Sequence, residues 1–298
     1  MLFLKTVARD IIPIPETVSL VLAIGIFDGV HLGHERVIQK ATEIARSIGG
    51  KTVVYTFSPH PTAILGNRKN LILTSEQKFM RLNRLNVDYL VEQHFDKDFA
   101  SLNPEDFMDT LKHKFKTINT ICIGQNFRFG SGRIGDASYL RSISPGFGIK
   151  TTVIQSLMAN DTIISSTRIR QELVNGNLTM ANSMLGYNYY CSCSFEGKIQ
   201  LNDIQILTFS VQNEQQIGSG VYSVNVLSAN KICHGVADYL HRSQPGKLSL
   251  HLLGNQPKPS DNVTIEFLSL IRERMTFSTD SERVAQIKKD IEATEKLT

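Results

Sequence analysis

The sequence contains only four cysteines, and their spacing fits neither a zinc site nor a secreted disulfide framework. They are Cys122, Cys191, Cys193 and Cys233. No apolar run approaches the roughly eighteen residues that a membrane-spanning helix needs, and no signal-peptide pattern opens the chain. We therefore expect a soluble, cytoplasmic protein without a membrane partner.

The sequence also lacks a strong excess of either positive or negative charge. Lys and Arg number 32 against 28 Asp and Glu, which gives a formal net charge of +4. This excess is too small to predict nucleic-acid binding, although it suits a small anionic ligand. The length of 298 residues exceeds what one core usually needs and predicts two domains. Composition does not predict the oligomeric state.

The segment Gly25–His34 carries the strongest functional signal. It follows an apolar run that predicts a short buried strand, and it precedes an amphipathic run that predicts a helix. His31 and His34 flank Gly33 at the helix start, where unpaired backbone N–H groups and the positive end of the helix dipole point outward. Imidazole donors added at such a helix start predict a polyphosphate site.

Two less specific interpretations of this segment stay open. The histidines can lie on the surface of an ordinary helix N-terminus, with the glycines serving only the turn. They can also form a metal pair at i, i+3, but no Cys, Asp or Glu at ligand spacing supports this. We therefore predict no metal ligands in the chain itself.

Strands and helices alternate through the first half of the chain. Strands are predicted at 21–26, 52–57, 87–91 and 118–123, and helices at 33–48, 74–85 and 103–115. Such alternation predicts an α/β domain with a mostly parallel, Rossmann-like sheet. Ligands of these sheets bind beyond the carboxyl ends of the strands. The segment 25–34 and the loops 58–61 and 124–135 should therefore meet at one edge.

The second half has a different pattern. Helices are predicted at 167–175 and 178–185, followed by strands at 204–211, 220–227, 247–253 and 263–270. Short strands separated by turn signals predict a small antiparallel β-barrel, and residues 282–296 predict a closing C-terminal helix. We place the domain boundary near Gly186, which gives domains of 1–186 and 187–298.

Three further segments accompany the first one in a fixed order, namely Thr56–Pro61, Gly124–Gly130 and Ser165–Arg170. Together with Gly25–His34 they resemble the adenylyltransferase module of the bacterial bifunctional riboflavin kinase/FAD synthetase family. The family transfers AMP from ATP to the phosphate of FMN and uses Mg²⁺ with ATP. The resemblance therefore implies ATP and FMN as substrates, FAD and pyrophosphate as products, and a nucleotidylyltransferase domain at 1–186.

The resemblance also assigns roles to individual residues. The transfer is in-line and needs mainly positioning and charge neutralisation. The catalytic groups that it implies are His31, His34, Ser166, Thr167 and Arg170. The ATP contacts that it implies are Gly25, Phe27, Asp28, Gly29, Gly33 and Ser165. The FMN contacts that it implies are Pro59, Pro61, Asn126, Phe127 and Arg128.

Several of these residues also have a purely structural interpretation. Ser165 and Ser166 can cap a helix, and His60 can serve only the turn between its two neighbouring prolines. Phe127 and Phe129 suit packing better than flavin stacking. The loop arginines, Arg128 and Arg133, can be solvated charges.

The second half resembles the riboflavin kinase barrel of the same family, with two departures. Residues 201–218 contain no Pro-Thr-Ala-Asn segment, whose threonine and asparagine hold Mg²⁺ and phosphate in the family. Ser249 occupies the position of the family's glutamate general base. A serine is a far poorer proton acceptor than a carboxylate. The leading hypothesis is therefore an FAD synthetase with a degenerate riboflavin kinase half.

Other hypotheses stay open. The chain can be a bifunctional riboflavin kinase/FAD synthetase whose replacement residues the sequence does not reveal. It can also be a non-catalytic flavin- or nucleotide-binding regulator on an inherited scaffold. A related adenylyl- or cytidylyltransferase that acts on another phosphate is disfavoured by the segments Thr56–Pro61 and Gly124–Gly130.

Overall fold

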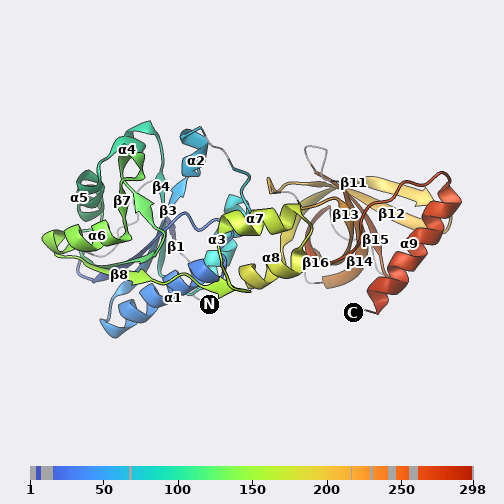
Figure 1. Cartoon of the computed structure of the whole chain (residues 1–298). Coiled ribbons are helices and arrows are strands. Elements are labelled where there is room, and N and C mark those ends of the chain that lie inside the picture. Colours follow the sequence, from blue (N-terminus) through green and yellow to red (C-terminus); the bar gives the residue numbers. More distant parts are fainter. Residues whose placement is uncertain are drawn as a thin grey trace. The chain divides into compact units, whose positions relative to one another are not determined.

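The computed structural model describes residues 5–7, 16–66, 69–215, 217–228, 231–240, 246–254 and 261–296. The chain divides into two compact units (Figure 1). The first comprises Met1–Lys69 and Ser75–Ile164, and the second comprises Asn70–Thr74 and Ser165–Thr298. Each unit is described by itself.

The first unit is built on a parallel sheet. In chain order its strands are β1 (Lys5–Val7), β2 (Leu20–Ile24), β3 (Lys51–Ser58), β4 (Tyr89–His94), β5 (Ile118–Gly124) and β8 (Lys150–Ile154). Their order in the sheet is β1-β4-β3-β2-β5-β8, and each neighbouring pair is parallel. The carboxyl ends of the adjacent strands β3, β2 and β5 therefore meet at one edge, as the sequence predicts.

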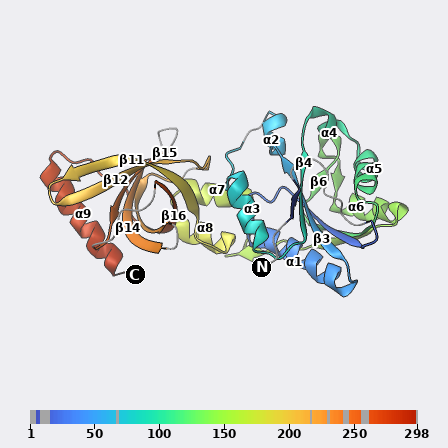
Figure 2. The ribbon, with the colours of Figure 1, turned by 180° about the vertical axis from the view of Figure 1, so that it is seen from behind.

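Helices cover both faces of this sheet. α1 (Leu32–Ser47) and α3 (Ser75–Asn83) lie on one face, and α5 (Pro104–Lys114) and α6 (Ala137–Ile143) lie on the other (Figure 1). The view from behind shows the same arrangement (Figure 2). All residues of β2 are buried, which explains its uninterrupted apolar sequence. Alternate residues of β2 share a core cluster with Phe107 and Leu111 of α5.

Local signals set the ends of these elements. Asn103 caps α5, because its side chain accepts a hydrogen bond of 2.8 Å from the N–H of Asp106, and Pro104 is the first helical residue. The connections contain α2 (Pro61–Ile64), α4 (Lys97–Ser101), and the hairpins β6 (Arg128–Phe129)/β7 (Gly135–Asp136) and β9 (Met158–Ala159)/β10 (Thr162–Ile163).

The second unit centres on a closed antiparallel barrel. Its strands are β11 (Tyr190–Leu201), β12 (Ile204–Val211), β13 (Gly220–Ser228), β14 (Lys231–Leu240), β15 (Gly246–Leu252) and β16 (Asn262–Arg272). Their order around the barrel is β11-β12-β15-β14-β13-β16. The rings of Tyr222, Tyr239 and Phe267 are completely buried, and both tyrosines contact Phe267 edge-to-face. The predicted barrel is confirmed.

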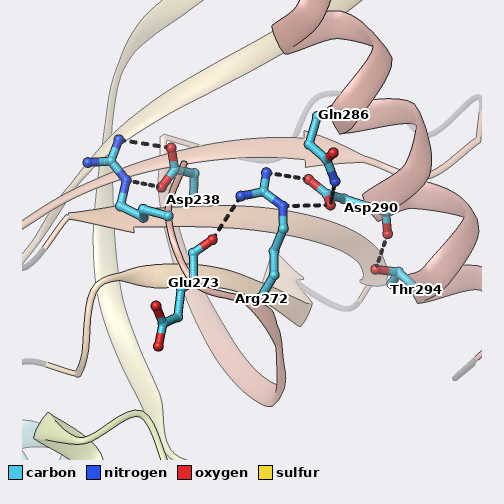
Figure 3. Close-up of polar contacts among 7 residues, drawn as sticks. Asp238, Arg272, Glu273, Gln286, Asp290 and Thr294 are labelled. Atoms are coloured by element: carbon cyan, nitrogen blue, oxygen red, sulfur yellow. Dashed lines mark hydrogen bonds and ion pairs between the residues drawn. The ribbon is translucent and has the colours of Figure 1, made fainter. Parts of the chain in front are cut away.

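Helices α7 (Ser166–Val174), α8 (Leu178–Leu185) and α9 (Asp280–Glu295) accompany the barrel. α9 lies against its outer surface (Figure 1), where Val284 packs on Ile204 and Ile206. Asp290 of α9 is buried and accepts hydrogen bonds of 2.9 and 2.7 Å from Nε and Nη2 of Arg272 at the end of β16 (Figure 3). The predicted C-terminal helix is therefore part of the barrel unit.

Among the described residues, no helix combines the length and the apolar character that a membrane span requires.

Candidate functional site

A strained turn connects β2 to α1. Phe27, Gly29 and Val30 have φ angles of +53°, +81° and +34°, which only glycine adopts without strain. The side chains of Phe27 and Val30 are buried, so packing holds them in place. The hydroxyl of Thr56 on β3 donates a hydrogen bond of 3.0 Å to the carbonyl of Ile26 and ties the turn to the sheet edge. Backbone strain of about 1–3 kcal/mol per residue is concentrated at functional sites.

The turn brings two histidine rings into contact at the N-terminus of α1. His31 is the N-cap residue, and its Nδ1 accepts a hydrogen bond of 3.3 Å from the backbone N–H of His34. The rings are stacked, with centroids 3.6 Å apart and planes inclined by 16°. Phe27 contacts His34 edge-on at a centroid distance of 5.3 Å. Because Nδ1 of His31 is an acceptor, a neutral His31 ring carries its proton on Nε2.

The surroundings of His34 keep its ring neutral at pH 7. The pKa of His34 lies well below its usual value, mainly because the ring is removed from water and secondarily because His31 is a second titratable base beside it. Within the described residues, Nδ1 of His34 is buried without a hydrogen-bond partner. Such a group costs about 1–3 kcal/mol, so a ligand that hydrogen-bonds to this nitrogen would relieve that cost.

Two glycines of the segment make room for these rings. A Cβ on Gly25 would lie 2.9 Å from the ring of Phe27, and a Cβ on Gly33 would lie 3.1 Å from the ring of His31. The packing of the ring of Phe27 therefore favours glycine at position 25, and a side chain at position 33 would displace the ring of His31. Asp28, the other predicted ATP contact in this turn, is 5% exposed.

The second predicted loop leaves the carboxyl end of β3. Pro59 follows the last residue of the strand, and Pro61 is the first residue of α2. His60 is the N-cap of α2, and its Nδ1 accepts a hydrogen bond of 3.2 Å from the N–H of Thr62. This bond supports the structural interpretation of His60. The two prolines lie at the same sheet edge as the histidine pair.

The third predicted loop leaves the carboxyl end of β5. Phe127 stacks on Phe129 with ring centroids 5.6 Å apart, and both pack against the core of the unit. This arrangement supports the packing interpretation of the two phenylalanines. Asn126 donates a hydrogen bond of 3.4 Å to the hydroxyl of Ser156, and Arg128 lies 3.6 Å from a carboxylate oxygen across the β6–β7 hairpin. Asn126 and Arg128 therefore present polar groups from an exposed loop.

The remaining predicted phosphate contacts lie at the start of α7, in the second unit. Ser165 is the N-cap, and its hydroxyl accepts a hydrogen bond of 3.3 Å from the N–H of Arg168, which supports the capping interpretation for Ser165. Ser166 and Thr167 are the first two helical residues. Nε of Arg170 donates a hydrogen bond of 2.8 Å to the carbonyl of Asn70. The predicted catalytic residues thus form two groups, one in each unit.

A row of three residues on adjacent strands crosses the outer face of the barrel at Ser249, where the sequence departs from the kinase family. Ser249 of β15 pairs with Thr208 of β12 on one side and with Asp238 of β14 on the other. Cross-strand partners project to the same face, and the alternating neighbour Leu248 is buried inside the barrel. Asp238 also accepts hydrogen bonds of 2.6 and 3.1 Å from Nε and Nη2 of Arg274 (Figure 3).

Sequence reasoning did not identify Asp238 and Arg274 as partners. Asp238 alternates with the buried Ala237 and Tyr239, which indicates that it faces outward. Its neighbours on β13 and β15 depend on strand order and register, however, and neither can be read from one sequence. The sequence motifs therefore do not reveal this ion pair.

Comparison with known proteins identifies the class of both units. The family model of FAD synthetase matches residues 14–168, and that of riboflavin kinase matches residues 186–298. The bifunctional riboflavin kinase/FMN adenylyltransferase of Escherichia coli (strain K12) is 31% identical over 285 residues, which cover 91% of this chain and 90% of that protein. The bifunctional riboflavin kinase/FMN adenylyltransferase of Bacillus subtilis (strain 168) is 30% identical over 292 residues, covering 92% and 91%.

A solved structure shows the same fold. It is described as a macrolide-efflux protein from Streptococcus pneumoniae, and it matches with a TM-score of 0.83 and 24% identity over 94% of both chains. Fold and matched models together define a two-domain nucleotidyltransferase. The chain belongs to the bifunctional riboflavin kinase/FMN adenylyltransferase family.

The comparisons do not support the hypothesis of a degenerate kinase half. The riboflavin kinase model matches essentially the whole predicted barrel domain, and relatives matched over nine-tenths of the chain are named for both activities. The bifunctional alternative therefore fits the comparisons better than the leading hypothesis from the sequence. Ser249 and the missing Pro-Thr-Ala-Asn segment are therefore departures within a barrel that still matches the riboflavin kinase model.

Proposed function

We propose that the protein transfers AMP from ATP to the phosphate of FMN, which gives FAD and pyrophosphate. The stacked pair of His31 and His34 carries this proposal, because it adds imidazole groups to the unpaired N–H groups of α1 at the carboxyl edge of the sheet. An oxygen of the FMN phosphate attacks the α-phosphorus of ATP, and the bond to pyrophosphate breaks. The protein positions the reactants and neutralises their charge.

The family resemblance supports a role for each predicted residue. His31 and His34 contact the ATP phosphates and stabilise, through ring N–H donors, the charge that builds during transfer. Ser166, Thr167 and Arg170 hold phosphate oxygens through hydroxyl, N–H and guanidinium donors. The proposed ATP contacts are Gly25, Phe27, Asp28, Gly29, Gly33 and Ser165. The proposed FMN contacts are Pro59, Pro61, Asn126, Phe127 and Arg128.

Mg²⁺ enters this reaction with ATP, as part of the substrate. Among the described residues, no cluster of three or more His, Cys, Asp and Glu side chains is arranged to hold a metal ion. We assign adenylyl transfer to residues 1–186 and the second activity to residues 187–298.

We propose riboflavin phosphorylation as that second activity, on the basis of the matched kinase model. Its product, FMN, is the substrate of the first activity. A monofunctional FAD synthetase is the second candidate. Ser249 favours it, because a hydroxyl at the position of the family's glutamate is a poor proton acceptor near pH 7.

Two incubations of the full chain with MgATP test these assignments, one with FMN and one with riboflavin. Chromatography should detect FAD in the first, and FMN followed by FAD in the second. His31→Ala should slow FAD formation by about 10²-fold or more, as the loss of a transition-state donor does. His113→Ala is the matched control, since His113 is exposed in the last turn of α5.

Each assignment has its own contradicting result. Folded His31→Ala that forms FAD at the full rate would contradict the proposed role of the histidine pair. FAD formation from FMN without any FMN formation from riboflavin would leave the monofunctional candidate as the correct one.

A further inference from the structure

A carboxylate lies directly beside the serine at position 249. Asp238 of β14 and Ser249 of β15 are cross-strand partners in an antiparallel ladder. Their Cβ atoms are therefore about 4.5–5.5 Å apart and project to the same face of the barrel. The carboxylate of Asp238 is therefore about one strand spacing away from the position of the family's glutamate. A side chain can reach across this distance.

Arg274, two residues beyond the end of β16, orients this carboxylate. Nε and Nη2 of Arg274 donate hydrogen bonds of 2.6 and 3.1 Å to its two oxygens, in the bidentate geometry that fixes a carboxylate most firmly. Each carboxylate oxygen has two acceptor sites, so both oxygens keep one site for another partner. The side chains of Asp238 and Arg274 are 32% and 39% exposed, so a ligand has access to them.

Arg274 is itself placed by a firmly held neighbour. Arg272, two residues earlier, forms two hydrogen bonds with the buried Asp290 of α9. It also donates a hydrogen bond of 2.9 Å to the carbonyl of Glu273, the residue between the two arginines (Figure 3). The segment that carries Arg274 is therefore anchored to α9, and Asp238 is held in one orientation.

Two hydroxyl groups complete the row. Ser249 lies between Asp238 and Thr208, and all three residues are half-buried. Within the part of the chain that the structure describes, neither the Ser249 nor the Thr208 hydroxyl makes a hydrogen bond to another residue. A carboxylate next to two such hydroxyls suits a substrate that presents an alcohol.

We propose that Asp238 is the general base of the kinase half, in place of the glutamate whose position Ser249 occupies. This inference rests on the proposed riboflavin phosphorylation. Asp238 takes the proton of the terminal hydroxyl of riboflavin as that oxygen bonds to the γ-phosphorus of ATP. The bond between the γ-phosphorus and its bridging oxygen breaks, and the electron pair leaves with ADP. Asp238 then releases its proton to water, and Arg274 is a positioning residue.

The test measures FMN formation from riboflavin and MgATP by the full chain. Asp238→Asn keeps the size of the side chain and removes its basicity, so kcat should fall by about 10²–10⁴-fold with little change in KM. Asp203→Asn is the matched control. Asp203 is an exposed aspartate of the same barrel, paired with Lys288 of α9 at 2.9 Å, and its variant should keep the wild-type rate.

A second substitution separates a base from a structural ion pair. Ser249→Glu in the Asp238→Asn background returns a carboxylate to the same face and should raise kcat at least tenfold over Asp238→Asn alone. Adding Arg274→Gln to this double variant removes any ion pair that the new glutamate could form, so the gain in kcat should persist if it comes from a base and vanish if it comes from a repaired contact with Arg274. If Asp238→Asn does not fold, the charge-neutral pair Asp238→Asn/Arg274→Gln replaces it as the background for both measurements.

Two results would overturn the inference and are distinguishable. Folded Asp238→Asn that phosphorylates riboflavin at the wild-type rate would exclude Asp238 as the base and leave the kinase activity standing. A wild-type chain that converts FMN to FAD but forms no FMN from riboflavin would overturn the kinase assignment and this inference together.

Discussion

The buried ion pair between Arg272 and Asp290 should contribute strongly to the stability of the barrel unit. The side chain of Asp290 is 3% exposed and that of Arg272 is 19% exposed. Removal of one partner leaves an uncompensated charge and costs about 3–5 kcal/mol. Because Arg272 keeps some access to water and a bond to the carbonyl of Glu273, we expect the lower end of this range. Asp290→Ala should reduce the free energy of unfolding by about 3 kcal/mol.

Urea titration can measure this loss in the barrel. The chain has no tryptophan, so near-UV circular dichroism of tyrosine can report the transition. Tyr189, Tyr222 and Tyr239 are completely buried in this unit. With a slope of about 2 kcal/mol per molar urea, a loss of 3 kcal/mol lowers the midpoint by about 1.5 M. Asp203→Ala, which removes an exposed ion pair with Lys288, should leave the midpoint nearly unchanged.

A double variant tests the physical reason for this loss. Arg272→Met/Asp290→Leu removes both charges and should recover most of the stability that Asp290→Ala loses. Well-packed apolar residues often replace a buried ion pair at no net cost, whereas a single unpaired charge remains expensive. A midpoint shift below about 0.3 M for Asp290→Ala, or a double variant less stable than Asp290→Ala, would refute this reasoning.

Two further predictions concern the start of α1. Gly33→Ala should keep the unit folded, because alanine favours a helix by about 1 kcal/mol over glycine. Its Cβ, 3.1 Å from the ring of His31, should displace that ring and slow FAD formation about tenfold; an unchanged rate would show that the ring position is not critical. The pKa of His34 lies well below its unfolded value of about 6.5, so its contribution to stability is complete above that pH and is lost as the pH falls. His34→Gln should therefore reduce the drop in urea midpoint between about pH 7.5 and 5.5, and an equal drop in both proteins would contradict the neutral state of His34.

Hydrophobic periodicity predicts the long elements of this chain closely. The helix expected at 33–48 lies at Leu32–Ser47, and the strand expected at 204–211 lies at Ile204–Val211. These elements bury a complete face or stripe, so their pattern is regular. β8 and β14 were not predicted. β8 is an edge strand of half-buried residues apart from its exposed first residue, and β14 depends on pairing with β13 and β15.

For the candidate site, the sequence predicts only that the two histidines lie at the start of a helix. The order of strand, glycine-containing turn and helix predicts where His31 and His34 lie, because local signals set helix ends. The turn that precedes these rings has positive φ angles at Phe27 and Val30. No local preference favours these angles in bulky residues. They are imposed by burial of both side chains, which follows from the folded unit.

In the kinase half as well, the sequence alone does not show which side chains lie next to one another. Ser249 occupies the position of the family's glutamate, and the sequence around it contains no carboxylate that could replace this glutamate. In the barrel, the adjacent position on that face belongs to Asp238, which is 11 places earlier in the numbering and on another strand. A proton acceptor is defined by its place on the barrel face, not by its place in a sequence motif. The proposed role of Asp238 therefore makes the matched kinase model compatible with the serine at position 249.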